Sequence, residues 1–343
     1  MAKKALLIGI NNYSGKNKLS YCVNDCNELA KILKRNDDET INFEVKQIPN
    51  CPNARRALES IKELFEDKYA DTALFYFSGH GYIDANNNGG IVFPDNIESD
   101  SIYYGIQMDD IMKIVAKSPI KNKVIILDCC KSGKMASDED NSALLPDGCT
   151  ILTSSSADQN SVESEEVSHG IFTDLLIQAL DGEAADYLGH ITVGGIYAYI
   201  DRSLGLWGQR PIFKTNISTF ESIRNVTPRV DLPTIKETLK LFEEATDTYP
   251  LTPEHEWTEY GKDEQDDEKR KKKQEEARDN NKLCLTFQRL QKLVKIGFAE
   301  PTHKQDMYWE ALYKDEETGE NIGSCRLTKI GKYYWKLYKN GRI

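Results

Sequence analysis

Short apolar segments alternate with amphipathic helical patterns over the first 220 residues, and this alternation limits the possible folds more than any other feature. Four segments rich in β-branched and aromatic residues are typical of buried strands: residues 5–10, 72–77, 123–127 and 150–153. Apolar residues at helical spacing predict helices between them, at residues 24–34, 54–65 and 109–115. We therefore expect an α/β fold with a mostly parallel sheet and helices on both of its faces.

Glycine-bearing polar segments follow two of the predicted strands. Residues 78–81, Ser-Gly-His-Gly, come after the second strand, and residues 128–133, Asp-Cys-Cys-Lys-Ser-Gly, come after the third. Ligand sites in sheets of this kind lie beyond the carboxyl ends of the strands. The two segments are therefore expected to meet in one cleft. Two helices, at 171–180 and 192–204, and a last strand at 210–214 complete this core.

Length and changes in composition divide the 343 residues into three parts. Residues 1–220 form the predicted α/β domain. Residues 221–282 contain four prolines and the charged run 262–278, and we interpret them as a linker with a charged helical segment. Residues 283–343 are expected to form a small C-terminal α+β domain, because residues 325–335 resemble the last helix of a winged-helix domain.

The composition is typical of a globular protein, with 39% hydrophobic and 29% charged residues, and we expect no membrane span. The apolar segment near Met1 is too short for a signal peptide, so we expect a cytoplasmic protein whose eight cysteines are thiols. Zinc is not expected, since Cys22 and Cys26 have no second Cys or His pair at zinc spacing. The formal net charge of −11 disfavours nonspecific binding to nucleic acid.

Cys130 and His80 can supply two groups that attack on a peptide carbonyl requires, a thiolate and a partner that handles its proton. The glycine-bearing turns would also bring backbone N–H groups to the oxyanion, and we assign this role to the amides of Gly81 and Cys130. An isolated Cys or His is more often a structural residue, but the pair at two strand ends favours catalysis. Side chains alternate along a strand, so one of the two adjacent sulfurs, that of Cys129, should face the core.

The two segments, each after a hydrophobic strand, resemble the paired signatures of the caspase-like cysteine peptidases (clan CD, family C14), most closely those of metacaspases and bacterial caspase-like proteins. The resemblance extends over residues 1–220, and His80 precedes Cys130 by 50 residues, a spacing known from caspases. It implies a caspase-like sheet and Cys130, the second Cys of the motif, as the nucleophile. Metacaspases often have His where this chain has Lys131, which leaves details of the cleft open.

The same resemblance implies a primary specificity pocket that consists of four residues: Cys22, Asp25, Ser78 and Asp128. Carboxylates in such a pocket would bind a basic side chain, so the expected substrate is a protein that is cut after Lys or Arg. Two structural alternatives stay open. Asp25 could cap the helix that it begins, and Asp128 could accept backbone N–H groups in its turn.

The resemblance implies calcium as an activator. The chemistry of His80 and Cys130 itself requires no cofactor. The acidic positions of calcium-dependent metacaspases resemble four residues of this chain: Asp95, Asp109, Asp110 and Asp138. An acidic surface is the alternative interpretation, since no compact loop has calcium-ligand spacing. The polar segment 134–148 is expected to be an exposed loop and a candidate site of self-cleavage, with basic residues at Lys131 and Lys134.

The leading hypothesis is an endopeptidase with protein substrates whose C-terminal region binds a regulatory protein partner. Its resemblance to bacterial caspase-like proteins suggests a role in stress or phage defence. The alternative is a DNA-binding regulator that uses the winged-helix-like tail, although the tail lacks a dense basic face. An inactive scaffold is a third possibility, against which the intact His80 and Cys130 argue.

Overall fold

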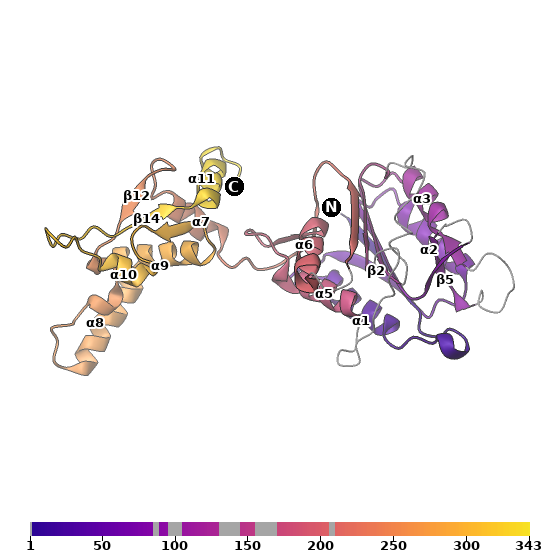
Figure 1. The fold of residues 1–343 in the computed structure, drawn as a ribbon, viewed down its shortest axis with the longest axis horizontal. Coiled ribbons are helices and arrows are strands. Elements are labelled where there is room, and N and C mark those ends of the chain that lie inside the picture. Colours follow the sequence, from indigo (N-terminus) through magenta and orange to yellow (C-terminus); the bar gives the residue numbers. More distant parts are fainter. Residues whose placement is uncertain (1, 85–88, 95–104, 130–144, 155–169, 206–209) are drawn as a thin grey trace. The chain divides into compact units, whose positions relative to one another are not determined.

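The protein forms two compact units, residues 1–227 and 228–343, in a computed structural model (Figure 1). The structure describes residues 2–84, 89–94, 105–129, 145–154, 170–205 and 210–343. Cys130 lies outside the described residues, as do Lys131, Lys134, Asp95 and Asp138. Each unit is described by itself.

Six strands form the central sheet of the first unit, in the order β10-β8-β7-β3-β1-β2. Five of them are parallel: β1 (Lys3–Gly9), β2 (Phe43–Pro49), β3 (Thr72–Ser78), β7 (Asn122–Asp128) and β8 (Cys149–Thr153). β10 (Ile212–Asn216) pairs antiparallel with β8 at one edge. The mostly parallel sheet expected from the sequence is confirmed.

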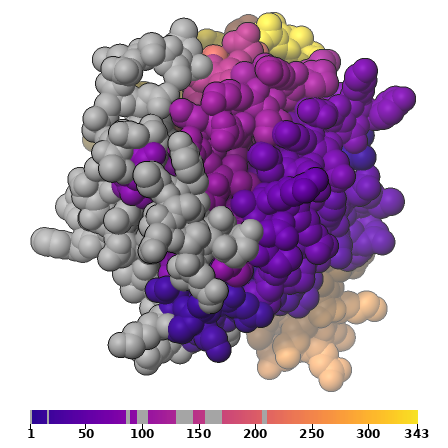
Figure 2. All heavy atoms as spheres, turned by 90° about the vertical axis from the view of Figure 1, so that its right-hand side faces the viewer, coloured from indigo at the N-terminus to yellow at the C-terminus, as the bar shows by residue number. Residues whose placement is uncertain are grey.

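Helices cover both faces of this sheet. One face carries α2 (Ala54–Phe65) and α3 (Met108–Lys117), whose outer surface is drawn in purple and magenta in Figure 2. The other face carries α1 (Cys22–Lys34), α5 (Ile171–Gln178) and α6 (Val193–Leu204).

Alternation along the strands divides the apolar side chains between two cores. In β7, Ile125 and Leu127 lie in the core under α2 and α3, whereas Val124 and Ile126 lie in the core under α1, α5 and α6. A strand buried on both faces is a continuous apolar run, which explains why the central strands were predictable from the sequence. The more polar edge strand β2 was not predicted, because only two of its seven residues are buried.

Two smaller antiparallel sheets accompany the central one, and neither was predicted. β4 (Gly81–Ile83), β5 (Gly89–Val92) and β6 (Gly105–Gln107) form the first, directly after the carboxyl end of β3. β9 (His190–Thr192) and β11 (Ser222–Asn225) form the second. Strands of three or four residues give too little periodicity for prediction.

The second unit combines helices with the three-stranded antiparallel sheet β12-β14-β13. The strands are β12 (Thr248–Pro250), β13 (Ala299–Pro301) and β14 (Ser324–Leu327). The α-helices are α7 (Leu232–Leu239), α8 (Asp267–Asn280), α9 (Lys282–Lys295), α10 (Met307–Ala311) and α11 (Lys329–Lys339). Two short 3-10 helices, Pro253–His255 and Trp257–Glu259, lie between β12 and α8.

Within residues 221–282 the expected charged helical segment is present as α8, but the remainder is not a linker. β11 belongs to the first unit, and α7, β12 and α8 are part of the second. The prolines that suggested a linker occupy positions where a regular element tolerates them: Pro233 lies in the first turn of α7, and Pro250 ends the edge strand β12. The C-terminal unit therefore begins near residue 228 and not at 283.

The seven cysteines that the structure describes are buried thiols. Within the described ranges, no helix is both long and apolar enough to cross a membrane.

Candidate active site

The described parts of the two motif segments, residues 78–81 and 128–129, meet at the carboxyl edge of the central sheet. β3 and β7 are parallel neighbours, and their last residues, Ser78 and Asp128, are partners in the register. The Gly79 N–H donates to the Asp128 carbonyl at 3.2 Å, which extends the pairing one residue beyond the strands. His80 follows in the β3–β4 turn, and Cys130 is two residues beyond Asp128 in the sequence.

Cys129 is completely buried in the core under α2 and α3, together with Leu127 and Ile125. This agrees with the expectation that one of the adjacent sulfurs faces the core. A buried thiol in apolar surroundings is inert as a nucleophile.

The His80 imidazole is held by the loop after β1. Its Nε2 lies 2.6 Å from the Asn17 carbonyl oxygen. A carbonyl only accepts, so Nε2 carries the proton and donates it, and Nδ1 of the neutral ring keeps its lone pair. The loop itself is held by Asn50, whose Oδ1 accepts from the amides of Asn11 and Asn12. This geometry gives His80 one ring nitrogen that can accept a proton.

Gly81, the expected oxyanion donor, is the first residue of β4. It pairs with Ile91 of β5, while the preceding pair, His80 and Val92, is bridged by a direct hydrogen bond from Val92 N to His80 O at 2.9 Å. Hydrogen-bonded and non-hydrogen-bonded pairs alternate in an antiparallel ladder. The ladder therefore directs the Gly81 N–H away from β5.

Three of the four predicted pocket residues meet beside this edge. Asp25, on α1, is 2% exposed and accepts from Ser78 Oγ at 3.0 Å. Asp128 is 8% exposed and accepts from Thr173 Oγ1, on α5, at 2.6 Å. A methyl group at Gly170 would lie 3.1 Å from Asp128 Oδ2 and 4.0 Å from Asp25 Oδ2. Both carboxylates thus face the same point at the start of α5.

Cys22 begins α1, one helical turn before Asp25 and Cys26, and is buried. Burial raises the pKa of the Cys26 thiol well above its usual value, and the charge of Asp25, then Cys22 and Asp128, raises it further. The fourth predicted pocket residue therefore lies within the electrostatic reach of the same group of side chains.

A chain of hydroxyl groups supports Asp128. Thr173 Oγ1 donates to the carboxylate and lies 2.6 Å from the hydroxyl of Tyr76, so the Tyr76 O–H donates to Thr173. Burial raises the pKa of Tyr76 well above its usual value, and the charges of Asp25 and Asp128 add to this. Tyr76 therefore stays protonated and acts as a donor.

The start of α5 adds to the electrostatics at Asp128. Gly170 is the N-cap of α5 and adjoins the Asp128 carboxylate. The partial positive charge of a helix N-terminus favours a nearby anion. Asp25 does not occupy the N-cap of its own helix, because Tyr21 does.

Two of the four residues expected for calcium, Asp109 and Asp110, are among those that the structure describes. Asp109 and Asp110 lie exposed in the first turn of α3, and Lys113 donates to Asp110 at 3.0 Å. Asp95 and Asp138 lie outside the described residues. Within the described parts of the chain, no group of three His, Cys, Asp or Glu side chains could hold a metal ion.

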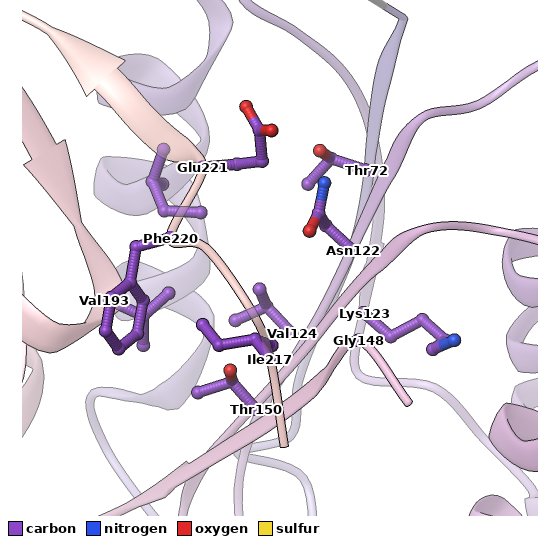
Figure 3. A pocket seen from close by; sticks show the side chains of 11 residues that line it. Thr72, Asn122, Lys123, Val124, Gly148, Thr150, Val193, Ile217, Phe220 and Glu221 are labelled. Carbon is purple, nitrogen blue, oxygen red and sulfur yellow. The ribbon is translucent and has the colours of Figure 1, made fainter. Parts of the chain in front are cut away.

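A small cavity lies at the opposite, amino-terminal edge of the sheet (Figure 3). Thr72 and Asn122, the first residues of β3 and β7, line it together with Phe220 and Glu221. Its volume of about 20 Å³ is enough for a single water molecule. It is therefore too small for a peptide side chain.

Sequence reasoning missed five residues that contact the predicted site residues or their partners: Tyr13, which accepts from His80 N at 3.0 Å, Asn17, Tyr76, Gly170 and Thr173. Tyr13 and Asn17 follow a predicted strand, as the motif segments do, and this placement was a signal that could have found them. Thr173 gave no such signal, because a threonine inside a helical segment has many structural explanations.

Comparison with known proteins places this geometry in a family. The family model of the caspase domain, Peptidase C14, matches residues 2–218. Metacaspase-1 of Kluyveromyces lactis is 28% identical over 148 residues, which cover 38% of this chain and 33% of that protein. Metacaspase-1 of Plasmodium falciparum is 31% identical over 150 residues, 38% of this chain and 24% of that protein. The matched segment thus spans a third or less of these two relatives.

The fold has solved counterparts as well. Protein GSU0716 from Geobacter sulfurreducens superposes with a TM-score of 0.51 at 14% sequence identity, covering 66% of this chain and 100% of that one. This likeness concerns the fold alone. The family model covers most of the chain, including both motif segments, and the chain therefore belongs to the caspase domain family, Peptidase C14.

Proposed function

We propose that the protein is a cysteine endopeptidase in which Cys130 attacks the peptide carbonyl and His80 handles its proton. The observation that carries this proposal is the His80 ring, whose Nε2 is bonded to the Asn17 carbonyl so that Nδ1 can accept a proton. His80 follows Ser78 by two residues and Cys130 follows Asp128 by two, and Ser78 and Asp128 are register partners. Two residues of chain span at most about 7 Å, which supports an approach of the two side chains.

In this mechanism the thiol proton moves to His80 Nδ1 as sulfur bonds to the carbonyl carbon. The Gly81 amide, directed away from β5, and the amide of Cys130 donate to the oxyanion. When the tetrahedral intermediate collapses, the imidazolium returns the proton to the leaving amine. Water then hydrolyses the thioester, with His80 as base.

The carboxylates of Asp25 and Asp128 favour a substrate with Lys or Arg before the cleaved bond. Both are buried and adjoin one point at Gly170. A cationic side chain entering there would form charge-assisted hydrogen bonds in a region of low dielectric constant. An acidic side chain would meet two like charges.

Cleavage of a peptide set with Lys, Arg or Asp at the position before the bond tests the activity. We expect the wild type to cut after Lys or Arg and Cys130→Ala to cut none of them. Cys129→Ala is the matched control, and it should keep the activity because Cys129 is a core residue. Equal cleavage by wild type and Cys130→Ala, or cleavage after Asp, would refute the proposal.

The pocket is tested by Asp25→Ala and Asp128→Asn, with the exposed Asp38→Asn as control. Loss of a buried ion pair with the substrate should reduce kcat/KM for a basic peptide by about 100-fold or more. Full activity of Asp25→Ala on a basic peptide would show that this pocket assignment is wrong.

Activation by calcium and by self-cleavage are further parts of the proposal. Activation by calcium is tested by measuring peptidase activity with added calcium and with a chelator. If the two activities are equal, calcium does not activate the enzyme, and the proposed calcium ligands are wrong: Asp95, Asp109, Asp110 and Asp138. Self-cleavage is tested by incubating each purified protein alone. We expect the wild type to be cut within residues 134–148 and Cys130→Ala to stay intact.

For the second unit we propose a winged-helix-like module that binds a regulatory protein. The sheet order β12-β14-β13, with α7 before the sheet and α9 before β13, is consistent with such a module. Residues 228–343 contain 22 Lys and Arg against 23 Asp and Glu, which gives no overall attraction to a polyanion. From the resemblance to bacterial caspase-like proteins we also propose a role in stress or phage defence.

DNA binding remains the second candidate for this unit. A labelled duplex and the full-length chain at two salt concentrations test it. A salt-dependent mobility shift at micromolar protein would favour the DNA-binding regulator, and no shift would favour the protein partner.

A further inference from the structure

The β4–β5 ladder is interrupted at His80. His80 and Val92 continue the register of Gly81–Ile91, and in a hydrogen-bonded antiparallel pair both residues exchange N–H···O bonds. Only one of these bonds is direct, from Val92 N to His80 O at 2.9 Å. The other passes through the Tyr13 hydroxyl: His80 N donates to Tyr13 Oη at 3.0 Å, and Tyr13 Oη donates to Val92 O at 3.1 Å.

Tyr13 reaches this position from the loop after β1 and is 1% exposed. Its ring also packs against the His80 imidazole, with 4.5 Å between centroids and 55° between planes. The same loop provides the Asn17 carbonyl that accepts from His80 Nε2 at 2.6 Å. One segment of chain therefore holds both the backbone and the ring of His80.

Residue 79 has no room for a side chain beside the Tyr13 hydroxyl. A Cβ at Gly79 would lie 2.5 Å from Tyr13 Oη and 2.8 Å from Phe77 Cζ, closer than real contacts allow. The glycine before the histidine thus makes room for Tyr13. This gives the Ser-Gly-His-Gly segment a physical reason that the sequence alone did not reveal.

We infer that Tyr13 is a positioning residue, whose hydroxyl sets the place of the His80 backbone and thereby of the imidazole. The inference rests on the proposed function of His80 as the proton acceptor. A phenol that is both donor and acceptor widens the strand pair on one side of His80 and leaves the other side paired. The main chain of His80 is thereby fixed at both its N–H and its C=O.

Burial ensures that the bridge keeps its proton. Desolvation raises the pKa of Tyr13 well above its usual value, so the hydroxyl remains a donor to Val92 O at every pH of interest. The phenol therefore does not exchange protons with the thiol, and its effect on the reaction is geometric.

The test is Tyr13→Phe in the full-length chain, which keeps the ring and removes the hydroxyl. The His80 amide and the Val92 carbonyl then lose their common partner, and the imidazole shifts. A displacement near 1 Å at a catalytic group costs up to about 100-fold in rate. We expect kcat on the best basic peptide to fall about 10-fold or more, with KM unchanged within about twofold.

A purely structural role is separated by a matched control and a second readout. Thr150→Val removes another buried hydroxyl from the central sheet, bonded to Thr215 Oγ1 at 2.9 Å near the opposite edge. It should lower thermal stability without changing kcat. The pH profile of Cys130 alkylation by iodoacetamide should move in Tyr13→Phe and not in Thr150→Val.

Tyr13→Phe with wild-type kcat and an unmoved alkylation profile would overturn the inference. If Tyr13→Phe does not fold, p-aminophenylalanine at position 13 keeps a polar donor, yet its nitrogen is a poor acceptor for the His80 amide, so kcat should still fall. Wild-type kcat for this variant also overturns the inference. Failure of the proposed function is seen separately, as cleavage that survives Cys130→Ala.

Discussion

Glu310→Gln should destabilise the second unit by about 3 kcal/mol at neutral pH. Glu310 lies on α10 and is completely buried. Its carboxylate accepts from Ser324 N at 2.9 Å, from His303 N at 2.9 Å and from Lys304 N at 2.6 Å. These contacts tie the segment after β13 to the start of β14. In Glu310→Gln, the side-chain NH₂ group would face one or more of these backbone N–H donors, and the hydrogen bond there would be lost.

The magnitude follows from the pKa of Glu310. Burial raises it, but the hydrogen bonds from Ser324, His303 and Lys304 outweigh burial and lower the pKa from 4.5 to about 2. At 1.36 kcal/mol per pKa unit, this depression stabilises the folded state by about 3 kcal/mol. Because the folded pKa is depressed, the contribution is fully present above pH 4.5 and is lost as pH falls through about 2.

Urea unfolding followed by tryptophan fluorescence is the assay, since three of the four tryptophans lie in the second unit: Trp257, Trp309 and Trp335. The difference between wild type and Glu310→Gln should be largest at pH 7 and shrink below pH 4.5. Glu300→Gln is the control. Its exposed ion pair with Arg326 should contribute less than about 1 kcal/mol. The reasoning would be refuted if Glu310→Gln lowered the free energy of unfolding by less than about 1 kcal/mol, or by an amount that does not depend on pH.

Three further outcomes are expected. Gly170→Ala should raise KM for basic peptides about 10-fold, because its Cβ would lie 3.1 Å from Asp128 Oδ2, and steady-state kinetics checks this. Burial lowers the pKa of His255 below 6.5, so pH-dependent melting should show stability present above pH 6.5 and lost below it, an effect absent in His255→Phe. Gly331→Ala should lower the Tm of the second unit by several degrees in calorimetry, because its Cβ would lie 1.8 Å from the Phe298 carbonyl oxygen.

The central strands and the position of the motifs could be predicted, since both depend on local pattern. Residues 73–77 form a continuous apolar run, as expected for a strand buried on both faces, and the segment after it had to lie at the sheet's carboxyl edge. The pairing of Asp128 with Thr173 could not be predicted. It joins residues 45 positions apart in the sequence through the docking of α5, and periodicity does not report such contacts.

In the second unit, the sequence predicted a linker where the structure has helices and a strand. Prolines and charge suggested a linker over 221–282, yet Pro233 only fixes the first turn of α7. Counting prolines shows only how often a helix or strand could be interrupted. Whether a given proline interrupts it depends on the position of that proline within the helix or strand. The charged helical segment expected in the run 262–278 is present as α8, of whose residues only Ala277 is buried.

Strand alternation places Asp128 and Cys129 on opposite faces of β7. Asp128 shares the face of β7 with Val124 and Ile126, which pack under α1 and α5, and it therefore meets Thr173 of α5. Cys129 shares the other face with Leu127 and is lost to the core. A residue inserted into β7 before Asp128 would exchange these faces and bury the carboxylate against α2 and α3. Such an insertion should abolish binding of basic peptides even with Asp128, Cys129 and Cys130 all present.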